Sequence, residues 1–212
     1  MPEEKTPTFC EKFEREVEQA LKAAPPHATI VCIADGSRSI WKYFENHAKL
    51  KKAIHVLDFW HAAEHLSHAS DALFGQGTAT AQRWFKKYRT CLKTEDNGVD
   101  KVIRSIRYYK QHLSKRSSRR HEEVRRVLGY FTRNRSRMQY AEYRKKAIPI
   151  GSGVVEAACK TLIGHRLKMA GMRWSLEGGQ SILNLRAAVL SGRWDAFWES
   201  HQEVLGAVRI AA

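Results

Sequence analysis

Two short apolar runs separated by a stretch of helical spacing constrain the fold of this chain more than any other feature. Residues 29–34 and 53–57 are apolar and rich in β-branched side chains without polar alternation, which is typical of strands covered on both faces. The stretch between them predicts a helix that Ser37 or Ser39 can cap and that ends near Leu50. This order predicts a βαβ unit, with two parallel strands joined by a right-handed crossover.

Each of the two runs ends at an aspartate, Asp35 after the first and Asp58 after the second. The carboxyl ends of neighbouring parallel strands meet at one edge of an open α/β sheet, and ligands usually bind at this edge. We therefore expect both carboxylates there. Carboxylate oxygens are the ligands that Mg²⁺ and Mn²⁺ prefer, so Asp35 is a candidate metal ligand.

The remainder of the chain has the spacing of amphipathic helices, with apolar residues recurring every three or four positions. The predicted helices cover residues 9–24, 60–74, 80–94, 98–113, 119–133, 133–144, 154–168, 175–191 and 195–208. We expect an α/β fold in which residues 1–77 and 148–212 form a partial catalytic domain. Residues 78–147 are then a large all-helical insertion.

Positive charge is concentrated in one part of the chain. The net charge is +15, and residues 78–147 hold 21 of the 37 lysine and arginine residues but only 6 of the 22 acidic ones. Such a concentration indicates a polyanionic partner, most often nucleic acid. The alternative is a helical face that is charged only to be soluble, but such a face does not require that its charges all have the same sign. The candidate DNA contacts in this segment are Arg119, Arg120, Arg125 and Arg126.

Composition excludes several classes of protein. The first residues do not form a basic segment followed by an apolar one, and the longest apolar run, residues 28–34, is far shorter than the about 20 residues that span a bilayer. The four cysteines are widely spaced and form no Cys-x-x-Cys pair. We expect a soluble, cytoplasmic protein with reduced thiols and no membrane partner.

Glu156 is the second candidate catalytic acid. It lies one turn into a predicted helix with a Gly-Ser-Gly entry, where free backbone N–H groups and the helix dipole favour negative charge. Taken by itself, Glu156 is best interpreted as an electrostatic cap. Lys160, Arg166 and Lys168 follow on the same helix, and a carboxylate beside several cations suits metal-assisted phosphoryl transfer on DNA. That chemistry normally takes three carboxylates, and Asp35 would be another of them.

Two further motifs have competing interpretations. His61-x-x-Glu64-His65 matches the inverted zinc-peptidase motif, with both histidines on one helix face. A further acidic ligand would have to come from the basic segment, so zinc proteolysis is a remote alternative. The favoured interpretation is that Asp58 and His61 orient each other near the end of the strand.

Arg173 and Trp174 join a guanidinium group to a large aromatic ring, which can stack on the bases of distorted DNA. The alternative for these two residues is a hydrophobic anchor for the terminal helices. We favour the anchor for Trp194 and Trp198, which are spaced four apart.

Taken together, these motifs resemble the ISKra-type bacterial insertion-sequence transposases. The resemblance rests on ADG at 34–36 with Trp41, LDFWHAAEHL at 57–66, GSGVVEAACK at 151–160, RLK at 166–168, GMRW at 171–174 and GRW at 192–194. It implies the DDE superfamily and a ribonuclease H-like fold. It also implies Mg²⁺ or Mn²⁺ as cofactor and transposon-end DNA as partner.

Residue by residue, the resemblance implies that Asp35 is the second catalytic aspartate and Glu156 the catalytic glutamate. Asp58 and His61 match a supporting D-x-x-H motif. A ribonuclease H-like fold begins with a three-stranded meander that carries the first catalytic aspartate, and nothing before Phe9 is long enough to build it. A triad of Asp35, Asp58 and Glu156 is a lesser alternative. A single predicted helix separates Asp35 from Asp58, whereas a ribonuclease H-like fold has two strands in that interval.

We therefore expect the C-terminal part of a transposase, with an incomplete metal site and no catalysis by itself. Self-association, or association with a missing N-terminal half, is the expected consequence of an open sheet edge. A nucleic-acid-binding protein without catalysis is the alternative function.

Overall fold

The computed structural model describes the backbone of residues 6–114 and 118–199 and the side chains of residues 11–114, 118–153 and 155–199. The chain divides into two compact units. One comprises Met1–Pro26 and Gly153–Ala212, and the other comprises His27–Ser152. The predicted helix at residues 195–208 lies mostly outside the described residues.

The unit of residues 27–152 contains the predicted βαβ arrangement. Strands β1 (Val31–Ala34) and β2 (Ile54–Leu57) pair in parallel, in register from the first residue of each to the last. Between them lie helix α2 (Arg38–Asn46) and the short 3-10 helix η1 (Leu50–Lys52). The parallel pairing predicted from the two apolar runs is confirmed.

Helix α2 covers the sheet through aromatic side chains. Trp41 and Phe44 are buried, and their rings lie 5.8 and 5.9 Å from the ring of His55 in β2. Because residues three apart share one side of a helix, α2 presents both rings to the sheet.

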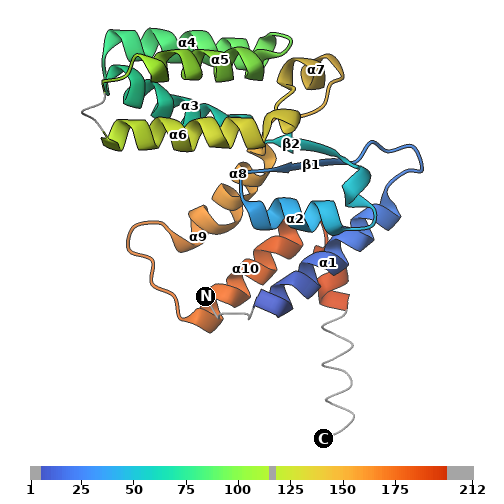
Figure 1. The fold of residues 1–212 in the computed structure, drawn as a ribbon. Helices are drawn as coiled ribbons and strands as arrows, with labels where there is room; N and C mark the ends of the chain where they lie inside the picture. The colour runs from blue at the N-terminus through green and yellow to red at the C-terminus, as the bar shows by residue number, and fades with distance from the viewer. Residues whose placement is uncertain (1–5, 115–117, 200–212) are drawn as a thin grey trace, which may run out of the picture. The chain divides into compact units, whose positions relative to one another are not determined.

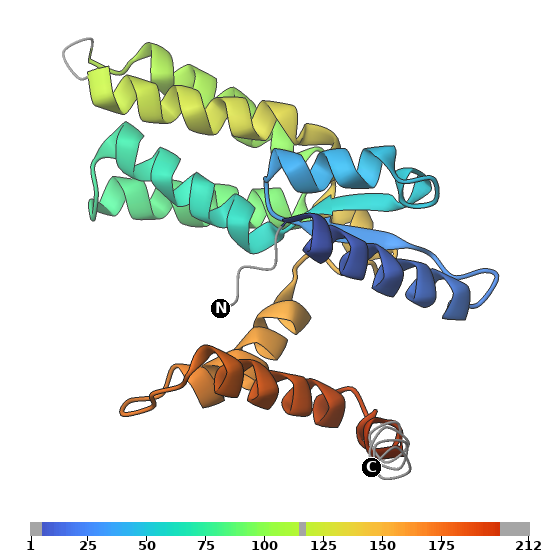
Figure 2. The ribbon, with the colours of Figure 1, turned by 90° about the horizontal axis from the view of Figure 1, so that it is seen from below.

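The basic segment, residues 78–147, folds as helices that pack with the preceding helix of residues 59–74 in the same unit. Helices α3 (Phe59–Phe74), α4 (Ala79–Thr94), α5 (Gly98–Gln111) and α6 (Ser118–Arg133) pack as one group (Figures 1 and 2). The 3-10 helix η2 (Arg135–Arg137) and helix α7 (Tyr140–Lys145) follow.

The structure does not separate residues 78–147 as a unit of their own. The boundaries drawn at residues 77 and 148 from charge therefore differ from the compact units. The reason is that α3, which precedes the first boundary, packs extensively against both α4 and α6.

The core of this unit lies where the sheet meets the helices. Phe59, Phe131 and Tyr140 are fully buried, and the rings of Phe59 and Tyr140 meet edge to face at 5.3 Å. The hydroxyl of Tyr140 donates to the carbonyl oxygen of Leu57 at 2.9 Å. This bond satisfies a polar group inside the apolar core and fixes α7 to the end of β2.

The other unit contains α1 (Thr6–Ala23), α8 (Gly153–Cys159), η3 (Lys160–Gly164), α9 (His165–Leu167) and α10 (Leu176–Leu190). A single helix was expected over residues 154–168. Instead, η3 is a π-helical turn that separates α8 from α9.

The guanidinium of Arg186 in α10 explains how the π turn is accommodated. It donates to the carbonyl oxygens of Thr161 at 2.5 Å and Leu162 at 3.2 Å. These bonds supply partners to carbonyl groups at the irregular turn. The chain as described is mostly helical, and the unit of residues 27–152 contains one small parallel sheet. None of the described helices is long and apolar enough to cross a membrane.

Candidate functional site

Asp35 lies directly after β1, at the carboxyl end of the strand. Its Oδ1 accepts a hydrogen bond from the backbone N–H of Ser37 at 2.8 Å, and its other oxygen has no hydrogen-bond partner among the described residues. A Cβ on Gly36 would lie 2.2 Å from Cε2 of Tyr130. Glycine follows Asp35 because the Tyr130 ring of α6 covers this part of the backbone.

Asp58, at the end of β2, has a different environment. It is fully buried, and its Oδ1 accepts from the backbone N–H groups of Trp60 at 2.7 Å and His61 at 3.2 Å. Its Oδ2 accepts from both the backbone N–H, at 2.5 Å, and the hydroxyl, at 2.6 Å, of Ser152. Burial raises the pKa of Asp58, but the donors of Ser152, His61 and Trp60 outweigh it and leave the pKa below its ordinary value.

Asp58 is therefore the N-cap of α3 and the anchor of the segment that ends at Ser152. Both oxygens accept hydrogen bonds from protein donors, which leaves Asp58 less open to a metal ion than Asp35 and disfavours the triad that includes it. Asp58 contacts His61 as expected, but it accepts a hydrogen bond from the backbone N–H of His61 and not from the imidazole ring. The ring nitrogen Nδ1 of His61 lies instead 3.8 Å from the carboxylate of Glu64.

A hollow of about 300 Å³ opens beside Asp35. It is lined by Asp35, Gly36, Ser37, His61, His65 and Tyr130. The hydroxyl of Tyr130 and Nδ1 of His65 are buried, and neither has a hydrogen-bond partner among the described residues. Buried polar atoms are normally paired, so two unpaired ones in a single hollow require an explanation.

Both side chains are held in their neutral forms. Burial, and then the nearby carboxylate of Asp35, raise the pKa of Tyr130 far above its ordinary value. Burial, and then the positive charge of Arg126, lower the pKa of His65. Near pH 7 the hollow thus contains a phenol that can donate, a neutral imidazole, and the carboxylate of Asp35.

A second hollow, of about 490 Å³, lies between α3 and α6. It is lined by His68, Asp71, Ala72, Gln76, Arg119, Arg120, Glu123 and Arg126. The guanidinium of Arg120 donates to the carbonyl oxygens of Ala72 at 2.5 Å and Leu73 at 2.8 Å, near the end of α3.

The four arginines predicted as DNA contacts on α6 thus differ in what they bind. Arg120 is occupied by backbone carbonyl groups of α3. Arg126 pairs with Glu123 at 2.6 Å, and Arg125 lies 4.0 Å from Glu122. Arg119 is exposed, and the described residues place no acidic side chain within 4 Å of it.

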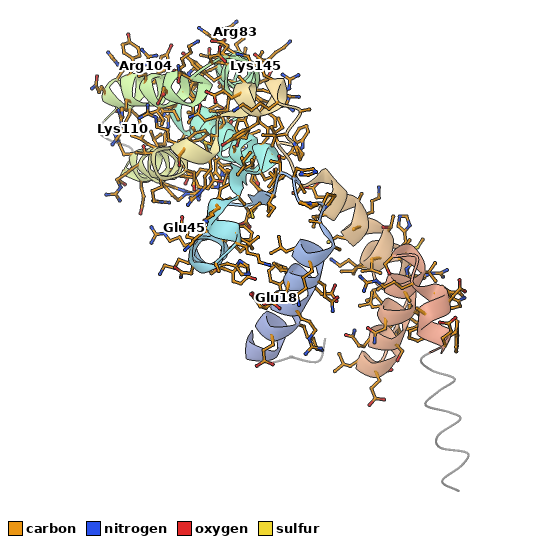
Figure 3. The ribbon with its side chains drawn as sticks, turned by 90° about the vertical axis from the view of Figure 1, so that its right-hand side faces the viewer. Glu18, Glu45, Arg83, Arg104, Lys110 and Lys145 are labelled. Atoms are coloured by element: carbon orange, nitrogen blue, oxygen red, sulfur yellow. The ribbon has the colours of Figure 1, made fainter. Side chains whose placement is uncertain are left out.

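Sequence reasoning placed DNA binding in residues 78–147 but named none of the individual cations on α4 and α5. Arg83, Lys86 and Lys87 of α4 and Arg104 and Arg107 of α5 are exposed, and none has an acidic partner within 4 Å in the part of the chain that the structure describes. Figure 3 shows Arg83 and Arg104 at the periphery of the helical group. Their spacing of three or four positions was a usable signal, because such residues share one helix face.

The remaining candidate residues lie in the unit that contains α8–α10. Glu156 is exposed on α8, and Lys160, Arg166, Lys168 and Arg173 are exposed as well. Asp35 and Glu156 therefore belong to different compact units.

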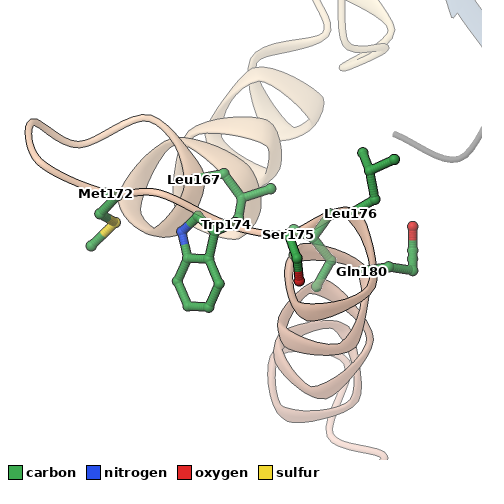
Figure 4. A pocket seen from close by; sticks show the side chains of 8 residues that line it. Leu167, Met172, Trp174, Ser175, Leu176 and Gln180 are labelled. Carbon is green, nitrogen blue, oxygen red and sulfur yellow. The ribbon is translucent and has the colours of Figure 1, made fainter.

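Trp174 behaves as an anchor within its own unit. Its indole N–H donates to the carbonyl oxygen of Arg166 at 2.8 Å. The ring lines a hollow of about 250 Å³ together with Leu167 and Leu176 (Figure 4). This geometry favours the packing interpretation, although Trp174 keeps 44% of its surface exposed.

The described residues contain no cluster of three or more His, Cys, Asp or Glu side chains that could hold a metal ion. His61 and His65 share α3, but nothing in the described chain supplies the further ligand that zinc requires. The zinc-peptidase alternative therefore gains no support.

No family model, no curated protein and no solved structure matches this chain.

Proposed function

We propose that this chain binds DNA and is part of a DDE-type transposase with a ribonuclease H-like fold. The observation that carries the proposal is the position of Asp35: a carboxylate with a free oxygen, at the carboxyl end of a parallel strand, beside an open hollow. The exposed cations of α4 and α5 belong to the same compact unit. A carboxylate with a free oxygen, in a unit that also carries exposed cations, suits chemistry on a polyanion.

Within the unit of residues 27–152, Asp35 is the residue that would hold Mg²⁺ or Mn²⁺. Proteins often bind Mg²⁺ through only one or two carboxylates together with substrate phosphates. The free oxygen of Asp35 fits this mode, and Asp58 does not, because protein donors occupy both of its oxygens. When bound, such an ion would activate a hydroxyl or water and stabilise the leaving oxygen.

The salt dependence of DNA binding tests the first half of the proposal. Each phosphate contact contributes about 0.9 to the slope of log affinity against log salt. Replacing Arg83, Lys86 and Lys87 together by glutamine should reduce the slope by up to about 2.7 if all three contact phosphate. Fluorescence anisotropy of a labelled duplex provides the measurement.

The matched control replaces Lys49, Lys51 and Lys52 by glutamine, which removes three exposed cations outside the basic segment. The control should keep the slope of the unmodified chain. A flat salt profile for the unmodified chain would contradict DNA binding itself.

The second candidate function is DNA binding without catalysis, and the same exposed cations of α4 and α5 support it. The two functions differ in what they require of Asp35. A transposase site should bind Mn²⁺ more tightly in the presence of DNA, and Asp35→Asn should abolish that gain while leaving the salt slope unchanged. Electron paramagnetic resonance of free Mn²⁺ measures this binding, and indifference to Asp35→Asn would favour the non-catalytic function.

A further inference from the structure

The outer edge of β2 is covered by helix α7. In a parallel pair, the backbone groups of successive residues point alternately toward the partner strand and away from it. The register of the sheet leaves those of His55 and Leu57 pointing away from β1. Their carbonyl oxygens accept hydrogen bonds from the hydroxyls of Tyr143, at 3.4 Å, and Tyr140, at 2.9 Å. Side chains of α7 therefore occupy the acceptors of this edge.

The outer edge of β1 is open by comparison. The same register leaves the backbone N–H and carbonyl groups of Val31 and Ile33 pointing away from β2. None of these groups has a hydrogen-bond partner among the described residues. Natural sheets protect an open edge with charged side chains or proline, but residues 28–34 contain neither. Nothing in the sequence of this strand opposes pairing with a further strand.

The positions of the open groups determine which strand fits. An open edge pairs with an extended strand whose backbone groups have the same spacing. Val31 and Ile33 lie one on each side of Cys32, so the edge is complementary to itself. In an antiparallel pair with a two-fold axis at Cys32, Val31 of each copy lies opposite Ile33 of the other. Each such pair exchanges both of its hydrogen bonds, and every open group finds a partner.

The side chains also suit pairing between two copies. Opposed β-branched residues such as Val31 and Ile33 stabilise a pair of strands. Because residues 28–34 carry no charge, the two-fold axis brings no like charges into opposition along the strand. An extended strand of a different protein can use the same backbone groups, but the symmetry of the open positions favours a second copy.

We propose that the outer edge of β1 is a dimerisation surface, at which two copies of this chain pair as antiparallel strands with Val31 opposite Ile33. The two small sheets then form one continuous sheet across the axis. This inference is independent of DNA binding, because it uses only backbone groups of the sheet.

Sedimentation velocity of the full chain over a range of concentrations tests the pairing. The net charge of +15 makes the copies repel each other. The ionic strength is therefore at least about 0.15 M, which largely screens charges more than about 8 Å apart. We expect a reversible dimer.

A proline variant tests whether the dimer uses the backbone of β1. Val31→Pro removes an open N–H group from each copy but no bond to β2. It should weaken the dimer at least about 25-fold, which is about five-fold for each of the two lost bonds. Val31→Ala keeps the N–H group, so it is the matched control and should weaken the dimer by less than about five-fold.

Cross-linking tests the register. The proposed pairing places Cys32 opposite Cys32 of the second copy at a non-hydrogen-bonded position, with the Cα atoms about 4.5 Å apart. Disulfides span Cα distances of about 4.4–6.8 Å. With Cys10 and Cys159 replaced by serine, oxidation by diamide should give a covalent dimer, and a further Cys32→Ser should abolish it. Cys91 is buried and its pKa is raised to about 11, so it stays a thiol.

Each outcome decides for or against the pairing. A chain that stays monomeric at every concentration overturns it and leaves the edge to a strand of a different protein. A dimer that is equally tight in Val31→Pro, or that forms no link through Cys32, uses another surface and overturns it as well. If Val31→Pro has no melting transition, the cross-link alone decides. Failure of the chain to bind DNA would change none of these results.

Discussion

At the scale of single residues, Asp58 shows how a carboxylate can be buried without loss of stability. Four donors from Trp60, His61 and Ser152 satisfy its two oxygens. Asparagine would keep the acceptor for the first two but would turn an N–H group toward the donors of Ser152. We expect Asp58→Asn to lower the free energy of unfolding by about 1–3 kcal/mol at pH 7. Urea denaturation measures the difference.

This loss should depend on pH in a defined direction. The pKa of Asp58 in the folded chain is lower than its ordinary value of 3.8. Above that value both states are ionised and the full stabilisation is present, whereas below it the unfolded state takes up the proton first and the stabilisation declines. The difference in free energy of unfolding between the unmodified chain and Asp58→Asn should therefore be smaller at about pH 3 than at pH 7. Asp71→Asn, at a half-exposed position of α3, should change stability by less than about 0.5 kcal/mol at either pH.

The sequence predicted where Asp35 and Asp58 lie but not how differently they are bonded. Both follow apolar runs, which was enough to place them at the ends of parallel strands. The difference comes from Ser152, which is 94 positions from Asp58, and from Tyr130, whose ring covers Gly36. Contacts between residues so distant in sequence leave no trace in local spacing.

At the scale of elements, Arg120 fixes the relation of α6 to α3. Its planar guanidinium donates to two successive carbonyl groups, those of Ala72 and Leu73, in a geometry that a lysine ammonium cannot reproduce. We expect Arg120→Lys to lower the free energy of unfolding by about 1–2 kcal/mol. Arg119→Lys is the matched control and should have almost no effect, because Arg119 is exposed. Equal effects of the two substitutions in thermal denaturation would contradict this role.

The helices themselves were largely predictable, because each buries one side of a regular repeat. The expected helices at 80–94 and 98–113 correspond closely to α4 and α5. The π turn at η3 was not foreseen. Its stabilising partner, Arg186, lies on another helix, and the spacing of residues 154–168 gives no sign of the interruption.

At the scale of the whole molecule, the two compact units differ in how much apolar surface they bury. Residues 27–152 enclose a core of fully buried side chains such as Phe59 and Phe131. In contrast, α10 leaves Leu176, Val189 and Leu190 more than half exposed. A helix with apolar residues on several sides is normally buried against other elements. Because α10 leaves these side chains exposed, few apolar contacts stabilise it.

Hydrogen exchange should reveal this difference directly. Opening α10 breaks few apolar contacts, whereas exchange within α3 requires the loss of the core around Leu66 and Ala69, both fully buried. We expect amides of α10 to exchange at least about 100-fold faster than those in the middle of α3, a gap of about 2.7 kcal/mol. The measurement is native-state exchange followed by mass spectrometry, repeated over a range of protein concentrations. Slow exchange of α10 that depends on concentration would mean that a second copy covers these side chains, and slow exchange at every concentration would contradict the expected difference between the units.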